Sequence, residues 1–502
     1  MAHEGGAAVR ARLNHPVIDA DGHWREFPPL LMEDLRRIGG SKAVEGFQAA
    51  GSRLNRLAVG LANTAPTADG FAAETARRRA RRELQGGWWQ TPWGSRDRAT
   101  AVMPKLLYER LDEIGLDFIV LFPTYGLSLP HIADEQARRA CCRAYNSYLA
   151  ERFASYSDRI TPVAPIPMHT PDEAIAELEH AVSELGLKAV MMGSLIRRSG
   201  EGGIWLDPLG IDSAYDYDPV WAKCQELGVA PAFHTAGNGL GLRVSPSNFV
   251  YNHIGHFASA QDAVCKALFL GGVTRRFPSL RFAFMEGGAG WACNLYSDLV
   301  GHWHKRNPKA LEQLRPSALN REEFLALAER FGDSGWAQFL HGPGADLDRL
   351  GLLLAVGIDV PETQDDFAQC GIAQGQDIRE LFAERFYFGC EPDDPTVVWA
   401  FNTRTNPYRA RLHPLFSSDI SHFDVPDMNG VLSEAYELVE DGALDRGQFR
   451  DFVFANSARY LTCNNPRFFS GTRVEAAVRE LLATEAQAAS LPDTPPSLAA
   501  TR

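Results

Sequence analysis

The sequence contains no long hydrophobic run, no excess of positive charge and few cysteines. No apolar run approaches the roughly 18 residues that a membrane-spanning helix needs, so we expect no membrane partner. The formal net charge is −13, and because phosphate binding needs a basic surface we expect no nucleic-acid partner. The 8 cysteines are scattered without a repeated C-x-x-C spacing, which predicts reduced and packed thiols.

The N-terminal stretch MAHEGGAAVRARLNHP lacks the apolar core of a secretory signal, which favours a cytoplasmic location. What the chain does contain is 45% hydrophobic and 23% charged residues over 502 positions. This composition allows a large buried core, built either as two to three domains or as one large barrel with insertions.

Short apolar runs alternate with amphipathic helical patterns along the chain. The clearest helix is PDEAIAELEHAVSELG (171–186), which has proline and acids in its first turn and glycine at its end. Such alternation predicts parallel strand pairing, and eight units match an α/β fold of the (β/α)8 TIM-barrel type. The predicted strands are 17–22, 117–122, 160–166, 188–193, 229–234, 280–286, 385–390 and 413–419.

A (β/α)8 barrel needs roughly 250 residues, and the surplus falls mainly into two helical insertions. The first insertion, 40–100, carries a basic run followed by a tryptophan cluster, which we interpret as a solvated helix face with an aromatic lid or oligomer contact. The second insertion, 303–383, is expected to cover the barrel mouth or to build the contact of a homodimer. The cluster in the first insertion consists of Trp88, Trp89 and Trp93.

These boundaries divide the chain into three predicted parts. Residues 1–16 form an N-terminal arm, and residues 17–470 form the metal-dependent barrel with its two insertions. Residues 471–502 form a C-terminal helix and a tail whose composition, rich in proline, alanine and serine, predicts disorder.

Several predicted strands end in titratable side chains, and catalytic residues of such barrels lie at the carboxyl ends of the strands. The titratable residues at or just beyond these ends are Asp21, His23, His234, Glu286, Glu391, Asp419 and His422. Strand alternation places Asp21 and His23, two positions apart, on the same face of the first strand. Imidazole and carboxylate ligands together suit Zn²⁺, Mn²⁺ or Fe²⁺. The sequence therefore predicts a metal site, with a barrel mouth of hydrogen-bonded polar residues as the alternative.

The mouth holds more candidate ligands than one metal ion needs. Candidates for a second ion are Glu286, His256, Glu391 and His422, whereas Glu286, His256 and Asp419 are candidates for general acid or base catalysis. Each has a structural alternative. His256 stands at a predicted helix start, and Glu391 can be a solvated loop residue.

Five neighbouring residues keep a structural alternative beside a functional one. His422 and Asp424 can act as partners that orient the metal ligands, and His253 can be packed or face the substrate. Asp19 can be a ligand, orient one, or be a hydrogen-bonding residue at the strand end, and Glu26 lies past the strand, where it can begin the next helix.

Four segments resemble the amidohydrolase superfamily. They are VIDADGH (17–23), FHTAGN (233–238), GGVTRRFPSLRFAFMEGGAGW (271–291) and SSDISHFD (417–424). The closer likeness is to the branch that contains aminocarboxymuconate-semialdehyde decarboxylase and resorcylate decarboxylase. It covers roughly 17–35, 103–300 and 385–470.

The resemblance implies that Asp21, His23, His234 and Asp419 hold a catalytic metal ion in a (β/α)8 barrel. Two positions depart from the commoner family pattern. The first metal-binding pair is Asp-x-His rather than His-x-His, a variant that this branch uses. The position at the end of the sixth strand, often histidine in relatives, is Glu286.

The first functional hypothesis is a metal-dependent hydrolase or decarboxylase of the amidohydrolase superfamily. It would act on a small organic acid or carbonyl compound through a metal-activated water or carbonyl. An arginine such as Arg197 or Arg411 would clamp the anionic substrate.

The second hypothesis is an O₂-dependent monooxygenase with two irons. The elements NHIGHF (252–257) and GCEPDD (389–394) resemble relatives of a nonheme diiron monooxygenase from diterpenoid antibiotic biosynthesis. That resemblance implies hydroxylation of a hydrophobic, terpenoid-like acid or its CoA thioester. A third hypothesis is a barrel that serves only as a binding or scaffold module, which would bind no metal.

Overall fold

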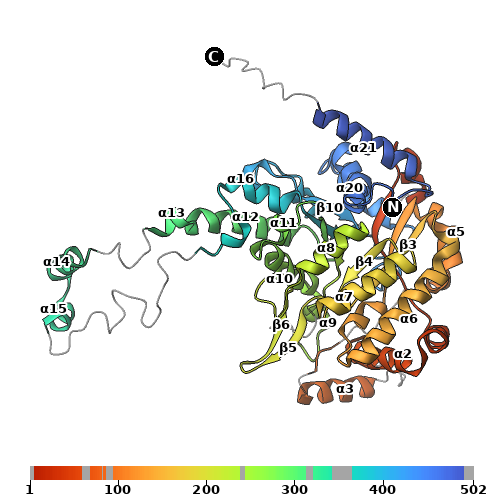
Figure 1. The fold of residues 1–502 in the computed structure, drawn as a ribbon, viewed down its shortest axis with the longest axis horizontal. Coiled ribbons are helices and arrows are strands. Elements are labelled where there is room, and N and C mark those ends of the chain that lie inside the picture. The colour runs from red at the N-terminus through yellow and green to blue at the C-terminus, as the bar shows by residue number, and fades with distance from the viewer. Residues whose placement is uncertain are drawn as a thin grey trace.

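Eight short apolar segments pair in parallel, in an order that follows the sequence. They are β1 (Ile18–Trp24), β2 (Phe118–Pro123), β3 (Ile160–Ile166), β4 (Ala189–Met192), β7 (Pro231–Phe233), β8 (Phe282–Phe284), β9 (Phe386–Cys390) and β10 (His413–Phe416). Helices surround these strands, so the chain is a (β/α)8 TIM barrel, as the alternation predicts (Figure 1). The computed structural model describes residues 5–58, 68–81, 83–85, 94–237, 244–312, 320–341 and 365–490.

The barrel strands are apolar and nearly all buried because helices cover their outer faces. Aromatic rings reinforce three neighbouring strands. Phe233 of β7 stacks on Phe284 of β8 at 5.6 Å, and Phe284 stacks on Phe388 of β9 at 6.1 Å. Such a ladder of rings fixes the register of the strands that carry the site residues.

The first and last strands meet at the mouth of the barrel. The backbone N–H of Asp419 donates to the carbonyl oxygen of Asp21 at 3.0 Å, and the N–H of His23 donates to that of Ile420 at 3.1 Å. The carboxylate of Asp19 accepts hydrogen bonds from the Ser418 hydroxyl, the Ser418 N–H at 3.0 Å and the Asp21 N–H at 3.1 Å. Asp19 therefore joins the two ends of the sheet, in the hydrogen-bonding role that the sequence predicts for it.

Helices of ordinary α geometry make up most of the remaining structure. They are α1 (Gly6–Arg12), α2 (Pro28–Ala58), α3 (Ala68–Arg81), α4 (Ser95–Val102), α5 (Pro104–Ile114), α6 (Glu135–Phe153), α7 (Pro171–Leu178), α8 (Asp218–Leu227), α9 (Phe249–His253), α10 (His256–Leu270), α11 (Val273–Arg276), α12 (Gly290–Arg306), α13 (Pro308–Leu311), α14 (Arg321–Phe331), α15 (Ser334–His341), α16 (Gly375–Ile378), α17 (Val397–Ala400), α18 (Val431–Glu440), α19 (Arg446–Arg450), α20 (Asn456–Thr462) and α21 (Glu475–Ser490). No described helix is long and apolar enough to cross a membrane.

Short turns of 3-10 or π geometry complete the list of elements. The 3-10 turns are η1 (Gly126–His131), η2 (Ala154–Tyr156), η6 (Ala368–Cys370) and η8 (Pro407–Arg409), and the π turns are η3 (Glu179–Glu184), η7 (Arg379–Ala383) and η9 (Asp451–Ala455). Helix α7 with η3 confirms the helix predicted over 171–186. Its first turn is capped by Thr170, whose side chain accepts from the N–H of Glu173 at 3.2 Å.

All eight predicted strands are confirmed, with two differences in detail. A hairpin of β5 (Ile196–Gly200) and β6 (Gly203–Asp207) follows β4 and was not predicted. Its strands are short and mostly exposed, so they lack the buried apolar run that marks most of the barrel strands. Strands β8 and β10 end before Glu286 and Asp419, the residues with which the predicted strands ended.

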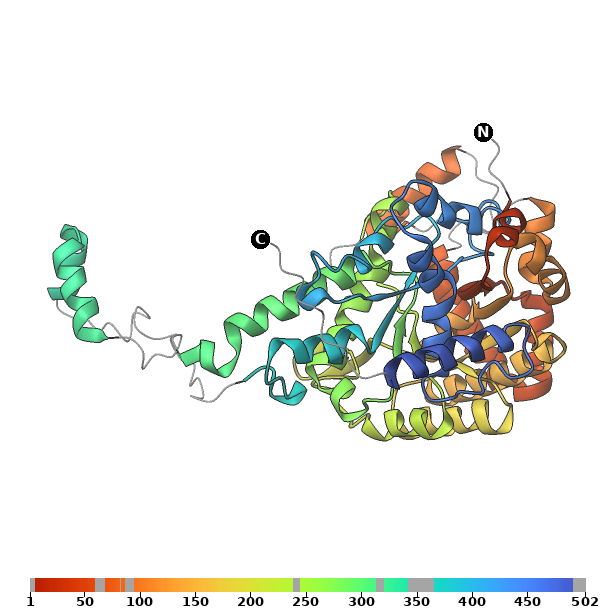
Figure 2. The same ribbon diagram turned by 90° about the horizontal axis from the view of Figure 1, so that it is seen from above.

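The two insertions differ in position. In the first, helix α2 packs against α6 on the side of the barrel. In the second, helices α14 and α15 lie away from the barrel (Figures 1 and 2), so these described helices do not cover its mouth. Trp88, Trp89 and Trp93, and the predicted disordered tail from residue 491 onward, lie outside the described residues.

The hydrogen bonds of Asp19 predict a large stability cost for its removal. Asp19→Ala leaves buried donors on Ser418 and Asp21 without an acceptor, so the free energy of unfolding should fall by about 3 kcal/mol. Urea denaturation of the full chain measures this. Glu201→Ala, in the exposed hairpin turn, is the control and should change stability by less than about 0.5 kcal/mol.

Candidate metal site at the barrel mouth

Side chains from four barrel strands converge at the mouth. Asp21 and His23 come from β1, and His234 follows β7 directly. Gly22 between the first two points away from them, where an added Cβ would lie 2.3 Å from Cδ1 of Ile119. No side chain fits at this position, so glycine allows the strand to carry two ligands on its inner face.

Glu286 and Asp419 reach the mouth from beyond the ends of β8 and β10. Both have a left-handed backbone, with φ of 58° and 49°, which is uncommon for residues other than glycine. This conformation ends each strand early and turns the side chain toward the barrel axis. Strain of this kind costs about 1–3 kcal/mol per residue and gathers at functional sites.

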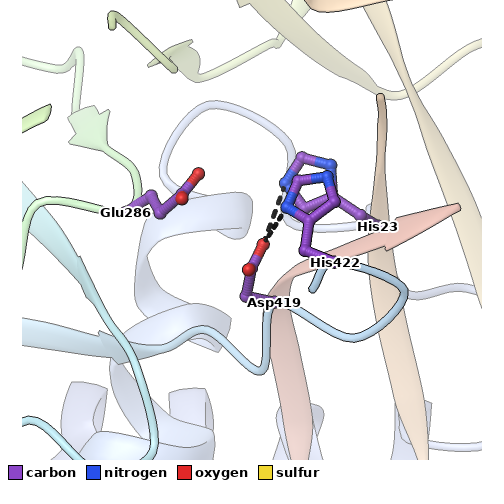
Figure 3. A group of neighbouring side chains, drawn as sticks. All are labelled: His23, Glu286, Asp419 and His422. Atoms are coloured by element: carbon purple, nitrogen blue, oxygen red, sulfur yellow. Dashed lines mark ion pairs between the residues drawn. The ribbon is translucent and has the colours of Figure 1, made fainter. Parts of the chain in front are cut away.

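The nitrogen and oxygen atoms of these side chains lie close together, and Figure 3 draws His23, Glu286 and Asp419 among them. The Nε2 atoms of His23 and His234 are 3.2 Å apart, and Asp21 has an oxygen 3.3 Å from the first and another 3.6 Å from the second. Asp419 Oδ1 lies 3.6 Å from His23 Nε2, and Glu286 Oε2 lies 3.0 Å from His234 Nε2.

Hydrogen bonding fixes which nitrogen of His23 faces the mouth as an acceptor. Its Nδ1 lies 3.2 Å from the carbonyl oxygen of Pro123, which can only accept, so Nδ1 carries the proton. Nε2 then presents a lone pair toward His234. Ligating histidines in metal sites show this arrangement, in which a carbonyl oxygen orients the ring.

The carboxylates at the mouth lack hydrogen-bond donors. Among the described residues, both oxygens of Asp21, both of Asp419 and Oε2 of Glu286 are buried without a hydrogen-bond partner. Buried polar atoms of this kind are rare and costly unless they are paired. A cation between the two imidazole lone pairs and these oxygens would satisfy them, so the residues fit a divalent metal ion.

Burial shifts the pKa values of the whole group in the same sense. It raises the pKa of Asp21 to about 7 against the opposing effect of His234, and it raises that of Asp419 well above its usual range. Burial lowers the pKa of His23 to about 3 and that of His234 to about 4. Both histidines are therefore neutral and able to ligate, whereas the carboxylates ionise readily only with a cation beside them.

A second group of possible ligands adjoins the first. Glu286 groups with His253 and Asp424, and also with Glu391, Asp419 and Asp424, with the contributing atoms within 4.8 Å of one another. Burial and the neighbouring Asp424 raise the pKa of Glu391 to about 8. These side chains repel one another unless protons or a second cation neutralise them.

The predicted second-metal residues are only partly brought together. Glu286, Glu391 and His422 belong to such groups, whereas His256 belongs to none among the described residues, and its ring lies 4.7 Å from that of His253. His253, the other histidine among the surplus candidate ligands of the sequence, belongs to such a group in place of His256. The sequence signal for it was the pair of histidines in NHIGHF, which spacing alone could not rank.

Aromatic rings line the site. Phe122 lies 5.5 Å from the ring of His234, and Phe257 lies 5.3 Å from it on another side. His23 stacks on His422 at 4.0 Å, and Phe423 lies 5.6 Å from His253. Apolar rings therefore pack against the histidines of the site.

The arginines proposed as an anion clamp are not well placed. Arg411 precedes β10, so it lies at the opposite end of the barrel, 3.5 Å from Asp451. Arg197 is exposed on the β5–β6 hairpin. Arg25, which directly follows β1 and donates to the Tyr125 hydroxyl at 3.1 Å, is the arginine at the mouth that the sequence analysis missed.

Removal of a ligand should abolish metal binding without unfolding the barrel. We expect His23→Ala and Asp419→Ala to lose the bound metal, because each removes an atom of the central group, while circular dichroism stays that of the folded chain. Metal per chain, measured by elemental analysis, checks this. His180→Ala, at a partly exposed histidine paired with Glu184, is the control, and full metal content in either test variant would contradict the site.

Metal affinity should weaken as the pH falls. Below a pH of about 7 the Asp21 carboxyl holds a proton that the metal must displace, and the raised pKa of Asp419 acts in the same direction, so the affinity for Zn²⁺ should drop by at least about tenfold per pH unit between about pH 7 and pH 5. The neutral histidines do not add to this slope above a pH of about 4. Competition with a chromophoric chelator measures the affinity. Asp21→Asn should bind more weakly with a shallower slope, and an unchanged slope would assign the proton elsewhere.

The chain is similar in sequence to a known protein family and to several curated proteins. A family model described as amidohydrolase matches residues 18–321. The γ-resorcylate decarboxylase of Polaromonas sp. is 30% identical over 213 residues, which are 40% of this chain and 60% of that protein. The 2-amino-3-carboxymuconate-6-semialdehyde decarboxylase of Dictyostelium discoideum is 25% identical over 222 residues, which are 44% of this chain and 57% of that protein.

A dihydroxybenzoic acid decarboxylase from Polaromonas sp., with bound manganese and 2-nitroresorcinol, covers 91% of this chain and 99% of its own, with 16% identity and a TM-score of 0.45. The matched parts of the two curated relatives span about 60% of their lengths. Since the family model matches more than half of the 502 residues, the chain belongs to the amidohydrolase family.

Proposed function

We propose that this chain is a metal-dependent decarboxylase of an aromatic or conjugated organic acid. The observation that carries the proposal is the buried group of Asp21, His23, His234 and Asp419 beside the buried Glu286. Both curated relatives named above are decarboxylases of unsaturated acids, which favours loss of CO₂ over hydrolysis. Hydrolysis by the same site is the outcome that the substrate test below distinguishes.

Asp21, His23, His234 and Asp419 would hold one divalent ion, with zinc, manganese or iron matching this mixture of ligands. When bound, the ion supplies positive charge that polarises a substrate oxygen or acidifies a water molecule. Asp21 and His23 lie two positions apart on one strand, and His234 and Asp419 come from other strands. The substrate would therefore meet the ligands from the open end of the barrel.

Glu286 would supply the proton. Loss of CO₂ breaks a carbon–carbon bond and leaves its electron pair on the substrate carbon, which must take up one proton. Burial, together with Glu391 and Asp424, raises the pKa of Glu286 well above its usual range, so this carboxyl keeps its proton to a higher pH than an ordinary glutamate. His256 and Asp419 are the other candidates for proton transfer.

The ring-lined wall would orient a planar substrate and exclude water. Phe122 and Phe257 pack on either side of His234, and Phe423 closes the side near His253. A planar acid could stack on these rings with its carboxylate toward the ligand group. This wall is what favours an aromatic or conjugated acid over a short aliphatic one.

Release of CO₂ from hydroxybenzoates tests the proposal. The metal-loaded full chain is mixed with carboxyl-¹³C-labelled 2,6-dihydroxybenzoate and related hydroxybenzoates, and ¹³CO₂ is followed by mass spectrometry. In D₂O the product should carry one deuterium at the carbon that lost CO₂. Glu286→Gln should lower kcat by about 10²–10⁴-fold with metal retained, because the amide cannot release a proton.

Glu201→Gln, in the exposed hairpin turn, is the matched control and should leave kcat unchanged. Absence of ¹³CO₂ release from every acid, with hydrolysis of esters, lactones or amides instead, would assign the site to hydrolysis. Full activity of Glu286→Gln would transfer the proton role to another residue.

A second candidate function rests on the additional ligands. His253, Glu286, Glu391 and Asp424 could hold a second ion beside the first, and two irons among histidines and carboxylates suit O₂ chemistry. The substrate would then be a hydrophobic, terpenoid-like acid or its CoA thioester. Elemental analysis of aerobically purified protein separates the two. About one zinc or manganese per chain favours decarboxylation, and about two irons favour oxygenation.

The assembly and location of the chain belong to the same proposal. We infer a homodimer in the cytoplasm that binds a small-molecule acid. Light scattering coupled to gel filtration measures the mass of the assembly against the 55.3 kDa of one chain. A mass of one chain would contradict the dimer.

A further inference from the structure

We propose that Glu26 is a positioning residue for the metal site, acting through the loop 124–126 and Thr124 on His422. The inference rests on the proposed function, because it assigns the metal ligands as above. A helix start was the structural alternative for Glu26, and that alternative is wrong, since helix α2 begins at Pro28. Glu26 is instead buried, with 1% of its surface exposed.

The carboxylate of Glu26 accepts hydrogen bonds from the backbone of the loop that follows β2. Its Oε2 accepts from the N–H of Thr124 at 3.3 Å and of Tyr125 at 2.9 Å. Its Oε1 accepts from the N–H of Gly126 at 2.9 Å and from the hydroxyl of Tyr145. All three backbone partners can only donate, so the arrangement requires two acceptor oxygens.

The loop has little room to settle elsewhere. A Cβ added at Gly126 would lie 2.5 Å from Cβ of Pro123 and 2.9 Å from the ring of Tyr145. The chain therefore passes close to Tyr145 while its N–H groups donate hydrogen bonds to Glu26. Loss of the carboxylate would leave buried donors unpaired and would allow the loop to shift.

Thr124 transmits this constraint to His422. Its hydroxyl has a single proton, and the carbonyl oxygen of Trp24 at 2.8 Å can only accept it. The hydroxyl oxygen must then accept from Nε2–H of His422, 3.1 Å away. With the proton on Nε2, Nδ1 of His422 presents a lone pair 2.6 Å from Asp419 Oδ1, so a proton on Asp419 or a cation must lie between these two atoms.

The ring of His422 is thus held between the loop and the metal ligands. It stacks on His23 at 4.0 Å with the ring planes 29° apart, and its Nδ1 contacts Asp419, as Figure 3 shows. A shift of Thr124 would let this ring turn and would move the Nδ1 lone pair away from Asp419 and the other candidate ligands. Residues that orient metal ligands in this way change metal affinity or activity by about 10–100-fold when they are replaced.

Zn²⁺ affinity of the full chain tests the proposal without use of activity. Glu26→Gln keeps the size of the side chain but places an NH₂ group against a backbone N–H in either orientation of the amide. Thr124→Val keeps the shape of Thr124 but removes the acceptor. Both variants should bind Zn²⁺ about 10-fold more weakly in competition with a chromophoric chelator. Thr124→Ser, which retains the hydroxyl, should bind like the wild type.

A double variant tests whether the two residues act in series. Glu26→Gln combined with Thr124→Val should bind Zn²⁺ no more weakly than Thr124→Val alone, because Glu26 acts only through the loop. Losses that multiply would show independent effects and would overturn the relay. Tyr145→Phe removes one of the four donors and should give a smaller loss, and it replaces Glu26→Gln if that variant does not fold.

A purely structural role predicts a different result. Glu173, which is buried and pairs with Arg138 at 2.7 Å, provides the matched control. Glu173→Gln should lower the melting temperature and leave Zn²⁺ affinity unchanged. If Glu26→Gln behaves in the same way, Glu26 is structural only and the proposal fails.

The two proposals fail separately. If the wild type releases no CO₂ from any acid while the Glu26 and Thr124 variants still lose Zn²⁺ affinity, the positioning role stands and decarboxylation falls. If the wild type does release CO₂, the same variants should lower kcat with KM nearly unchanged. Wild-type Zn²⁺ affinity in both variants would overturn the positioning role alone.

Discussion

The contact between the first and last strands is the constraint on which the rest of this barrel depends. A closed sheet brings β1 against β10, where Asp19 holds Ser418 and the backbone of Asp21 holds Asp419. The two chain segments that meet here are separated by almost 400 residues, and each carries a candidate ligand. The same hydrogen bonds that complete the fold therefore set the distance between the ligands.

Closing the barrel brings four carboxyl groups together in a buried site. Asp21, Glu286, Glu391 and Asp419 all have raised pKa values, for which burial is the main cause. Without a cation these groups favour their protonated forms, which costs the folded state stability as the pH rises toward neutrality. A metal ion reverses that balance, so binding and folding are coupled. The neutral histidines are ready to bind throughout this range.

The sequence predicted those features that arise from local patterns. It predicted the barrel because eight short apolar runs alternate with amphipathic helical patterns. Strand-end residues such as His234 and Glu286 could be named because barrel geometry gathers strand ends in one place. The hairpin β5–β6 could not, since its strands are short and mostly exposed. Glu26 was misread because its partners lie about 100 residues away, and a sequence pattern carries no record of such contacts.

The left-handed backbone at Glu286 and Asp419 limits which residues can occupy these positions during evolution. Branched side chains such as valine are excluded by the backbone itself, before any chemistry is considered, whereas asparagine, aspartate, histidine and glycine adopt this conformation more readily. Exchange between histidine and an acid at the position of Glu286 is therefore among the few routes that leave the strand intact. A lineage could change its proton donor there by one substitution and keep the barrel, so the reaction can diverge faster than the fold.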